Sequence, residues 1–415
     1  MARPAAARAR LSASGHAPRE AEAARDARAQ AAGFVDARGR REYLQFAASA
    51  FLISFMYSHA ALLAVVFERE GFDLHDTGLL LSLYAGPVVL FTFLSGAVSA
   101  RIGVLNSCRL AVALMAMGFF SLRYTAGSFW PALASRLAQG TGQGLLLASF
   151  VTYGQSRLNA NRFVYLIGLF SSMFALAQAF APPLGAAVLN AFGARAMFLE
   201  GSIPALAAFA LTFGVRPIPL PKAGRGLDLK AALARSRPAS LAAIFVNGTM
   251  FGFTASFLAA LLEARAVPIG AFFLASTTTL FASRFLAMGV FETLDRRLLV
   301  ACGFLCQAAS LALLGAAGVS WLVAVAGILF GAGYSVIYPV LSAAVSAGLE
   351  PSERAGPQAL FNTAFNVGIF LMPYPVALLI GAFGYGASAF CLAALALASA
   401  ALLAAAALRR PEPKR

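Results

Sequence analysis

Long apolar runs dominate the chain from Tyr43 onward, and polar residues are largely confined to the intervals between them. The runs lack the strict alternation of apolar and polar positions that marks a membrane-spanning strand. Each run is close to the ~20 residues that a helix needs to cross ~30 Å of hydrocarbon. The pattern therefore predicts an all-α integral membrane protein with twelve transmembrane helices, over residues 43–67, 77–100, 105–124, 129–153, 163–190, 196–215, 240–262, 268–291, 298–317, 319–346, 357–381 and 384–408.

Composition favours a membrane protein over every soluble class. Of the 415 residues, 60% are hydrophobic and 12% are charged, and the mean hydropathy is +0.77. A soluble domain carries about 25% charged residues, so we exclude a soluble enzyme, a disordered chain, a disulfide scaffold and a coiled coil. The four cysteines lie in or beside apolar runs without metal-ligand spacing. They indicate small buried residues, and we expect no metal and no cofactor.

Basic residues gather on one predicted side of the membrane. With the N-terminus inside, 26 of the 32 lysines and arginines fall in inner segments and four fall in outer loops. Basic loops resist translocation, so we expect both termini to lie in the cytoplasm of a bacterial inner membrane. The formal net charge of +15 then follows from topology, and nucleic-acid binding is not needed to explain it.

The longest internal break divides the chain into two halves. We expect six-helix bundles over residues 43–215 and 240–408, a cytoplasmic linker over 216–239 and a short tail over 409–415. Residues 1–42 are rich in Ala and Arg, and their basic stretch is not followed by the apolar core of 7–15 residues that marks a cleavable secretory signal. This segment is expected to be a disordered cytoplasmic tail, part of which could form a surface helix. A mitochondrial presequence is the alternative, which its five acidic residues disfavour.

The two halves also repeat each other. Sequence identity between the halves is modest, but every matching pair is separated by the same number of residues. A parallel repeat of two six-helix halves is typical of transporters whose halves rock about a midplane site. At an offset of 191 residues, the matching pairs are Gly140 and Gly331, Gly142 and Gly333, Leu169-Phe170 and Leu360-Phe361, Pro182 and Pro373, and Phe192-Gly193 and Phe383-Gly384.

A loop motif and the six-plus-six layout resemble the major facilitator superfamily over about residues 43–408. The family pattern between helices two and three is G-x-L-x-D-R-x-G-R-R, and Ala100 stands here in place of its acid. The resemblance implies a charged latch between the halves. Without the family, both copies of the motif indicate basic anchors that fix topology. The matching residues are Gly96, Arg101 and Gly103, with Asp295 and Arg296 as a degenerate second copy between helices eight and nine.

Two further motifs lie inside predicted helices. Arg136, Gly140 and Gly142 are similar to the family's R-x-x-x-G-x-G in helix four, where glycines allow helices to approach closely. Pro182 and Gly185 in helix five resemble the G-P-x-x-G-G pattern of the family's exporters, with alanine at both ends. Proline bends a membrane helix, and the glycine keeps the bend thin enough to pack. The second resemblance favours export over import.

Arg136 and His59 are the candidate groups for charge and proton chemistry. An ionised guanidinium at the depth of Arg136 is costly in hydrocarbon, so it should face a wet cavity or a partner. Snorkelling to the outer headgroups is the alternative. His59 is the only histidine in a predicted membrane helix and titrates near neutral pH. A merely hydrogen-bonded structural histidine is the alternative to a coupling role.

Further polar residues lie on helices that line the central cavity in the family fold. Asn, Ser and Tyr also hold membrane helices together through interhelical hydrogen bonds, so a packing role is open for each. The candidates for substrate contact or coupling are Tyr57, Ser58, Gln143, Asn247, Tyr334, Tyr338, Asn362 and Asn366.

Chemistry that the predicted helices lack narrows the function. Glu200, Glu263 and Glu292 lie within about two turns of a helix end, and no acid lies deeper. His59 accordingly has no buried carboxylate to orient it, which disfavours a membrane-embedded enzyme. No ATP-binding P-loop occurs in the sequence. With Arg136 unopposed, the cavity should favour an anionic or neutral polar substrate.

The sequence therefore predicts a secondary active transporter rather than an enzyme. We expect it to export a small organic metabolite or xenobiotic, such as a siderophore, by alternating access and proton antiport. Import of an organic acid or sugar on the same fold is the alternative, and a non-transporting receptor or a membrane enzyme is more remote. The expected partners are the substrate, protons and the lipid bilayer, with no nucleic acid, and the chain is expected to be a monomer.

Overall fold

A computed structural model describes residues 25–159, 163–218, 229–286, 295–316, 318–350 and 353–409. Within these ranges the regular structure is helical, and one isolated backbone pairing joins Phe34 and Leu158. The helices in chain order are α2 (Ala37–Ser58), the 3₁₀ turn η1 (His59–Leu62), α3 (Leu63–Arg69), α4 (Leu74–Ser82), α5 (Ala85–Ile102), α6 (Val104–Thr125), α7 (Phe129–Gln155), α8 (Phe163–Phe192), α9 (Ala194–Leu211), α10 (Leu229–Arg235), α11 (Pro238–Ser256), α12 (Leu258–Glu263), α13 (Gly270–Leu286), α15 (Arg296–Ala316), α16 (Ser320–Ser346), α17 (Ala355–Phe370) and α18 (Pro373–Arg409).

These helices follow the twelve expected spans in order. Among the described residues, nine stretches are long and apolar enough to cross a membrane. One of them, Gly356–Ala406, contains two spans because the backbone bends at Gly384. Helix α7, with 27 residues, and helix α13, with 17, complete the set. Because a helix satisfies its own backbone hydrogen bonds in lipid, the prediction of an all-α membrane protein is confirmed.

The exterior of the molecule is apolar, as a lipid-facing surface requires. Phe192 is 76% exposed and Leu402 is 74% exposed. The two tryptophans of the chain, Trp130 and Trp321, each occupy the second position of a helix and are 75% and 66% exposed. Their amphipathic rings are suited to the membrane–water interface. They are also 191 residues apart, which adds a pair to the repeat.

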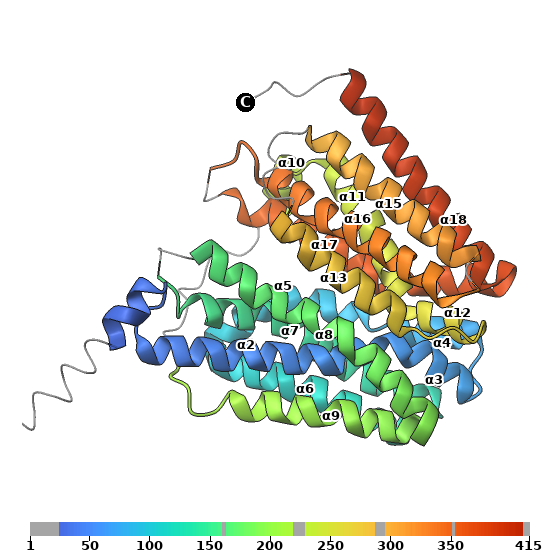
Figure 1. Ribbon diagram of the computed structural model, residues 1–415. Helices are drawn as coiled ribbons and strands as arrows, with labels where there is room; N and C mark the ends of the chain where they lie inside the picture. The colour runs from blue at the N-terminus through green and yellow to red at the C-terminus, as the bar shows by residue number, and fades with distance from the viewer. Residues whose placement is uncertain are drawn as a thin grey trace, which may run out of the picture.

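The helices form two bundles that meet at one end and diverge toward the other (Figure 1). Helices α2 to α9 make the first bundle, and helices α11 to α18 make the second. The bundles touch where α3, α4 and α12 lie, which we call the joined end. The starts of α2 and α11 and the C-terminal end of α18 mark the opposite end, which we call the far end.

Glycine contacts repeat between the bundles and confirm the internal symmetry. A Cβ atom added to Gly140 would lie 2.6 Å from the carbonyl oxygen of Tyr84, and one added to Gly331 would strike a backbone carbonyl of α13 in the same way. Gly142 and Gly333 likewise face backbone carbonyls of α6 and α15. In each bundle, the fourth span thus packs backbone to backbone against the second and third.

Two tight turns between spans are also equivalent. Gly193 has φ 82° and ψ 174°, and Gly384 has φ 81° and ψ 166°. Only glycine adopts this region without strain, so the matched Phe-Gly pairs of the sequence mark the same turn in both bundles. The first span of each bundle is broken at an equivalent point as well, since α2 ends at Ser58 and α11 ends at Ser256.

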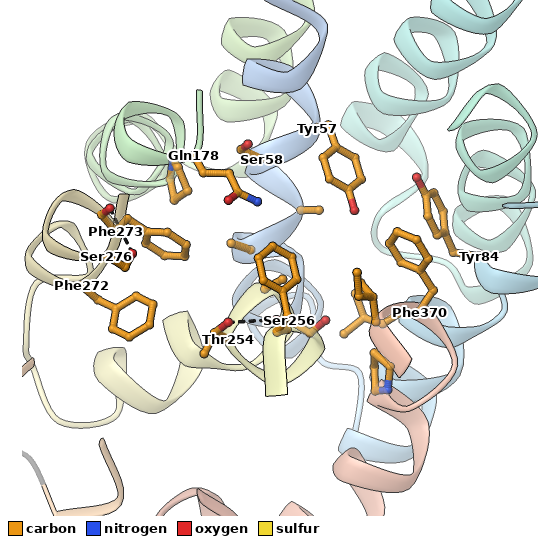
Figure 2. Close-up of a pocket in the computed structure, with 18 of the residues that line it drawn as sticks. Tyr57, Ser58, Tyr84, Gln178, Thr254, Ser256, Phe272, Phe273, Ser276 and Phe370 are labelled. Atoms are coloured by element: carbon orange, nitrogen blue, oxygen red, sulfur yellow. Dashed lines mark hydrogen bonds between the residues drawn. The ribbon is translucent and has the colours of Figure 1, made fainter. Parts of the chain in front are cut away.

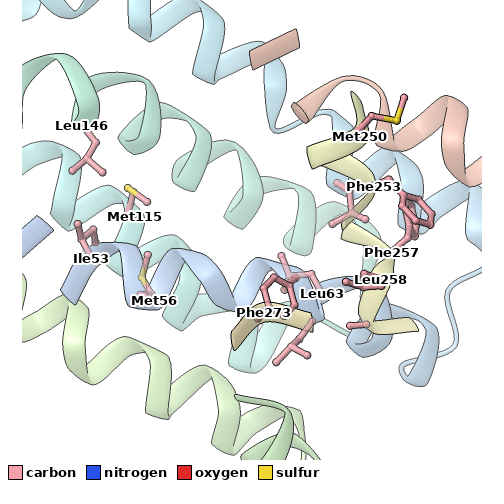
Figure 3. Packing of buried hydrophobic residues seen from close by; sticks show 14 of the residues in the cluster. Ile53, Met56, Leu63, Met115, Leu146, Met250, Phe253, Phe257, Leu258 and Phe273 are labelled. Carbon is pink, nitrogen blue, oxygen red and sulfur yellow. The ribbon is translucent and has the colours of Figure 1, made fainter. Parts of the chain in front are cut away.

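The bundles share an apolar core at the joined end. Figure 3 shows Leu63 of the first bundle in one cluster with Leu258 and Phe273 of the second. Gly78 faces the Ala377 side chain so closely that an added Cβ would lie 2.6 Å from it. These two small residues let the bundles pack closely. Ser82 adds polar contacts beside them, because its Oγ donates to the carbonyl of Leu371 at 3.0 Å and accepts from the backbone N–H of Tyr374 at 2.7 Å.

Part of the segment expected to be disordered is ordered. Residues 25–31 are helical, and α2 begins at Ala37, with the Asp36 side chain as its N-cap. Glu42, which was assigned to the tail, is 1% exposed on the second turn of α2. The prediction of disorder is therefore wrong from residue 25 onward. Residues 1–24 lie outside the described ranges.

Candidate functional site

A small cavity lies between the bundles near the joined end (Figure 2). The first bundle contributes the charged and amide groups of its wall, whereas the second contributes five phenylalanine rings and the hydroxyl groups of Thr254, Ser256 and Ser276. The cavity volume is about 60 Å³, which is room for a few water molecules at roughly 10–15 Å³ each. Its lining includes Tyr57, Ser58, Tyr84, Arg136, Gln178 and Pro182 from the first bundle, and Phe251, Ser256, Phe272, Phe273, Phe330 and Phe370 from the second.

Arg136 is the charged group of this cavity wall. Its side chain is 4% exposed, so snorkelling to the headgroups is wrong. Nη1 donates a 2.7 Å hydrogen bond to Oε1 of Gln139, and Nε donates at 3.3 Å to the carbonyl of Leu80. The guanidinium carbon lies 4.2 Å from the ring centre of Tyr84, a cation–π contact. Among the described residues, Nη2 has no hydrogen-bond partner.

Two tyrosines stand beside this guanidinium. Tyr57 and Tyr84 both line the cavity and project into it in Figure 2. The Tyr84 hydroxyl is buried and has no partner among the described residues. Tyr84 sits at the break between α4 and α5, and Gly140 lets α7 approach its backbone closely. The glycine motif of helix four therefore positions Tyr84 against Arg136.

His59 points away from this cavity into the first bundle. Its ring is 0% exposed at the start of η1, where the first span is broken. Nδ1 lies 2.9 Å from the carbonyl of Phe55, and Nε2 lies 2.7 Å from Oε2 of Glu200 on α9. The expectation that no buried carboxylate orients His59 is therefore wrong. The Glu200 side chain is 23% exposed and enters from the neighbouring helix.

Two glycines make the space that the imidazole occupies. A Cβ at Gly185 would lie 2.5 Å from Cδ2 and 2.8 Å from Nε2 of His59. A Cβ at Gly201 would lie 2.7 Å from the Phe119 ring and 3.4 Å from Nδ1 of His59. The glycine of the exporter-like motif thus has a packing role, because it admits the histidine between α8 and α9.

The other polar candidates do not line this cavity. Gln307 donates a 2.7 Å hydrogen bond to Oδ1 of Asn247, which joins α15 to α11. Tyr338 donates at 2.9 Å to Oδ1 of Asn362, which joins α16 to α17. The ring of Tyr334 stacks on Phe251 with ring centres 5.2 Å apart. Oε1 of Gln143 is buried without a partner among the described residues, and Asn366 is half-buried.

The loop motifs make no latch among the described residues. Arg101 is exposed and has no partner there, and Gly96 has open space around it. Gly103 has φ 88°, so its match to the family reflects the turn into α6. In the second copy, Oδ1 of Asp295 caps α15 by accepting from the backbone N–H of Arg297 at 2.7 Å.

Polar contacts join the bundles at a different place from the loop motif. Nε of Arg69 donates to Oε1 of Glu263 at 2.9 Å, and the Tyr385 hydroxyl donates to Glu68. We call these four residues the interbundle clasp. Arg69 and Glu263 are 41% and 42% exposed, and an ion pair this exposed stabilises by ~0–1 kcal/mol. The Arg69–Glu263 pair therefore adds little to the stability of the joined end.

A second charge cluster, absent from the sequence-based candidates, lies at the far end of the first bundle. Arg216, the first residue of the linker, binds Oε1 of Glu42 at 3.0 Å and Oδ1 of Asp36 at 3.0 Å. Nε of Arg157 lies 3.0 Å from Oε2 of Glu42, at an angle that makes an ion pair rather than a hydrogen bond. Hydrogen bonds from Arg216 lower the pKa of Asp36, and the two carboxylates raise the pKa of Arg216.

Comparison with known proteins places this geometry among transporters. The sequence profile of the Major Facilitator Superfamily matches residues 46–291 and 240–415. Uncharacterized MFS-type transporters of Burkholderia mallei and Burkholderia pseudomallei are 25% identical over 290 residues, which is 70% of this chain and 71% of theirs.

Two solved structures share the fold. A variant of the nucleoside transporter NupG superposes with a TM-score of 0.74 at 14% identity, covering 88% of this chain and 99% of its own. A peptide transporter POT variant superposes with a TM-score of 0.72 at 14% identity, covering 89% of this chain and 94% of its own.

Proposed function

Because this chain belongs to the Major Facilitator Superfamily and is a membrane transporter, we propose that it exports a small organic acid or polar metabolite across the bacterial inner membrane by proton antiport. The observation that carries this proposal is the divided wall of the cavity around Arg136. A buried guanidinium with a free Nη2 attracts an anionic or hydrogen-bond-accepting group. The aromatic second bundle provides a surface for a flat apolar part.

The cavity electrostatics support an acid over a cation. Its described lining holds Arg136 and no carboxylate. A buried positive charge in a low-dielectric wall repels ammonium groups and attracts carboxylates. The substrate class that this lining favours is therefore a planar or aromatic acid, with its carboxylate at Arg136 and Tyr84 and its ring against Phe251 or Phe330. Because about 60 Å³ holds only a few water molecules, the bundles must separate further to admit it. An aromatic-ring siderophore precursor belongs to this class.

The contact between His59 and Glu200 supports proton coupling. The Phe55 carbonyl can only accept, so Nδ1 carries a hydrogen and donates to it. One further proton must then lie between Nε2 and Oε2 of Glu200, because a lone pair facing a carboxylate 2.7 Å away would repel it. Loss of that proton would break the contact. Because η1 also lines the cavity through Ala60 and Ala61, proton release and cavity shape would change together.

The clasp and the basic loops support an orientation. The joined end carries the loops expected outside, and the far end carries most of the described arginines expected inside. We assign the joined end to the outer face of the membrane, so this conformation corresponds to an inward-facing state of the alternating-access cycle. A reporter fused within residues 216–239 tests this assignment, since it should report a cytoplasmic location.

Transport in vesicles tests the function directly. A thermal-shift panel of an aromatic carboxylate, an aromatic amine, a nucleoside and a dipeptide identifies the ligand, which is then followed in inverted vesicles with an imposed proton gradient. Arg136→Gln should abolish binding and flux. His59→Gln should abolish gradient-driven accumulation while substrate exchange persists. Arg195→Gln, which removes an exposed outer charge, is the matched control. Stabilisation by the amine alone, or flux that ignores the gradient, would refute the proposal.

Import is the second candidate. The packing role of Gly185 accounts for its place in helix five without reference to direction. An organic acid carried inward with protons would use the same cavity and the same His59–Glu200 contact. The direction of accumulation in whole cells decides between the two.

A further inference from the structure

A groove at the far end of the second bundle combines basic and apolar walls. It lies where α11 and α15 begin and where α16 and α18 end, and its volume is about 540 Å³. Arg237, Arg296 and Arg297 line it, together with Leu341, Leu402 and Leu403. No residue of the cavity described above belongs to it.

The charges around this groove favour an anion. Nη1 of Arg297 donates to the carbonyl of Ala406 at 2.8 Å, and Nη2 of Arg237 donates to the carbonyl of Ala347 at 3.2 Å, so backbone groups hold both side chains at the rim. Arg296 makes no hydrogen bond or ion pair with the described residues. The described lining contains no acid, and Asp295, next to Arg296 in the sequence, caps α15 through Oδ1. The groove therefore carries a net positive charge.

The apolar side of the groove opens toward lipid. Leu402 is 74% exposed on α18, a helix with a bare apolar surface. A site that needed only to hold free phosphate would not require such a wall. Basic pockets between membrane helices at the cytoplasmic side suit lipid headgroups, because the phosphate meets arginine while the acyl chains stay in hydrocarbon.

The first bundle carries a groove of the same chemistry. It lies between α2 and α9, its volume is about 420 Å³, and Arg40 and Arg41 line it. Leu44, which is 52% exposed, and Leu211 form its apolar side. This groove is also at the far end, so both bundles present arginines beside apolar surface at the same membrane edge.

We propose that these two grooves bind anionic phospholipids, each with its phosphate on the arginines and its acyl chains along the leucine wall. Each arginine near a headgroup strengthens binding about fivefold. Loss of two arginines from one groove should therefore weaken binding there about 25-fold. Zwitterionic phosphatidylcholine, whose choline opposes its own phosphate, should bind weakly in both.

Native mass spectrometry of the full chain in detergent tests the proposal. The protein is titrated with phosphatidylglycerol and phosphatidylcholine of identical acyl chains, and in a second arm with inorganic phosphate as competitor. Two double variants, Arg237→Gln with Arg296→Gln and Arg40→Gln with Arg41→Gln, are compared with the wild type. The control is Arg195→Gln, an exposed arginine on α9 near the joined end, whose circular dichroism spectrum and lipid retention should match the wild type.

The expected result is two tightly retained phosphatidylglycerol molecules, one of which is lost in each double variant, with little competition from millimolar phosphate. Four outcomes would overturn the proposal. These are equal retention of phosphatidylcholine, unchanged retention in both double variants, a loss in Arg195→Gln as large as theirs, and complete displacement by inorganic phosphate, which would indicate an ion site only. Unfolded variants are recognised by their circular dichroism, and Arg→Lys versions, which keep the charge, should then restore retention.

Discussion

Replacing Gly185 by alanine tests the placement of His59 most directly. The new Cβ would lie 2.5 Å from Cδ2 of the imidazole, about 1 Å inside a normal carbon–carbon contact. The ring cannot move freely, because Phe55 and Glu200 hold its two nitrogens at 2.9 and 2.7 Å. Overpacking of this kind costs about 1–3 kcal/mol, and breaking the contact with Glu200 to relieve it costs about as much.

Helix propensity acts in the opposite direction. Alanine is favoured over glycine inside a helix by about 1 kcal/mol, so the net loss for Gly185→Ala should be about 0–2 kcal/mol. Gly96→Ala is the matched control, since Gly96 lies inside α5 with nothing within 4 Å of its added Cβ. That variant should be neutral or slightly stabilised.

Thermal unfolding in detergent measures both variants. Each kcal/mol of lost stability lowers the unfolding temperature of a unit of 150–250 residues by about 2–4 °C. In a His59→Ala background only the contact of the new Cβ with Cδ1 of Leu62 remains, at 2.9 Å from the end of a flexible side chain, so Gly185→Ala should cost much less than in the wild type. The argument fails if Gly185→Ala behaves like Gly96→Ala, or if its penalty is the same with and without the histidine.

Three further outcomes follow from the clasp, the linker and the turns. In a Tyr57→Cys background, Arg69→Gln should raise the labelling rate of the new thiol by an external reagent by up to about fivefold, since the lost pair with Glu263 is worth ~0–1 kcal/mol. Asp36→Asn should lower thermal stability at pH 7. Because folding lowers the pKa of this carboxyl from its ordinary value of 3.8, the difference should vanish as pH falls below that value. Gly193→Ala should cost about 1–3 kcal/mol in thermal stability, since its φ of 82° suits only glycine.

Periodicity and length were sufficient to predict the twelve spans. Apolar runs of about 20 residues leave a chain few alternatives in lipid, and the turn glycines at 193 and 384 marked the joints of the repeat. Arg136 was also predictable as a buried, partnered group, because an isolated charge at its depth would be too costly. Both inferences depend only on the free-energy cost of placing a given segment or side chain in hydrocarbon, which can be judged without knowing its partners.

Partners far apart in sequence were not predictable in the same way. Glu200 lies 141 residues from His59 and near the start of α9, so its position along the helix gave no sign of the contact. Gly185 and Gly201, one on each flanking helix, were the available signal, since small residues mark where a bulky side chain fits. Glu42 was taken for a tail residue, although its nearest partners, Arg157 and Arg216, lie on segments that only the fold brings beside it.

The two halves share a break in the first span but differ in the residues at matching positions. Both breaks follow a serine, yet the next residue is His59 in one half and Phe257 in the other. At the offset of the later repeat, Gly327 stands where the first half has Arg136, and Cys391 stands where it has Glu200. The second half therefore carries neither the guanidinium of Arg136 nor the carboxylate of Glu200 at the matching positions. The proton chemistry that we propose for His59 and Glu200 is thus confined to the first bundle, whereas both bundles line the cavity.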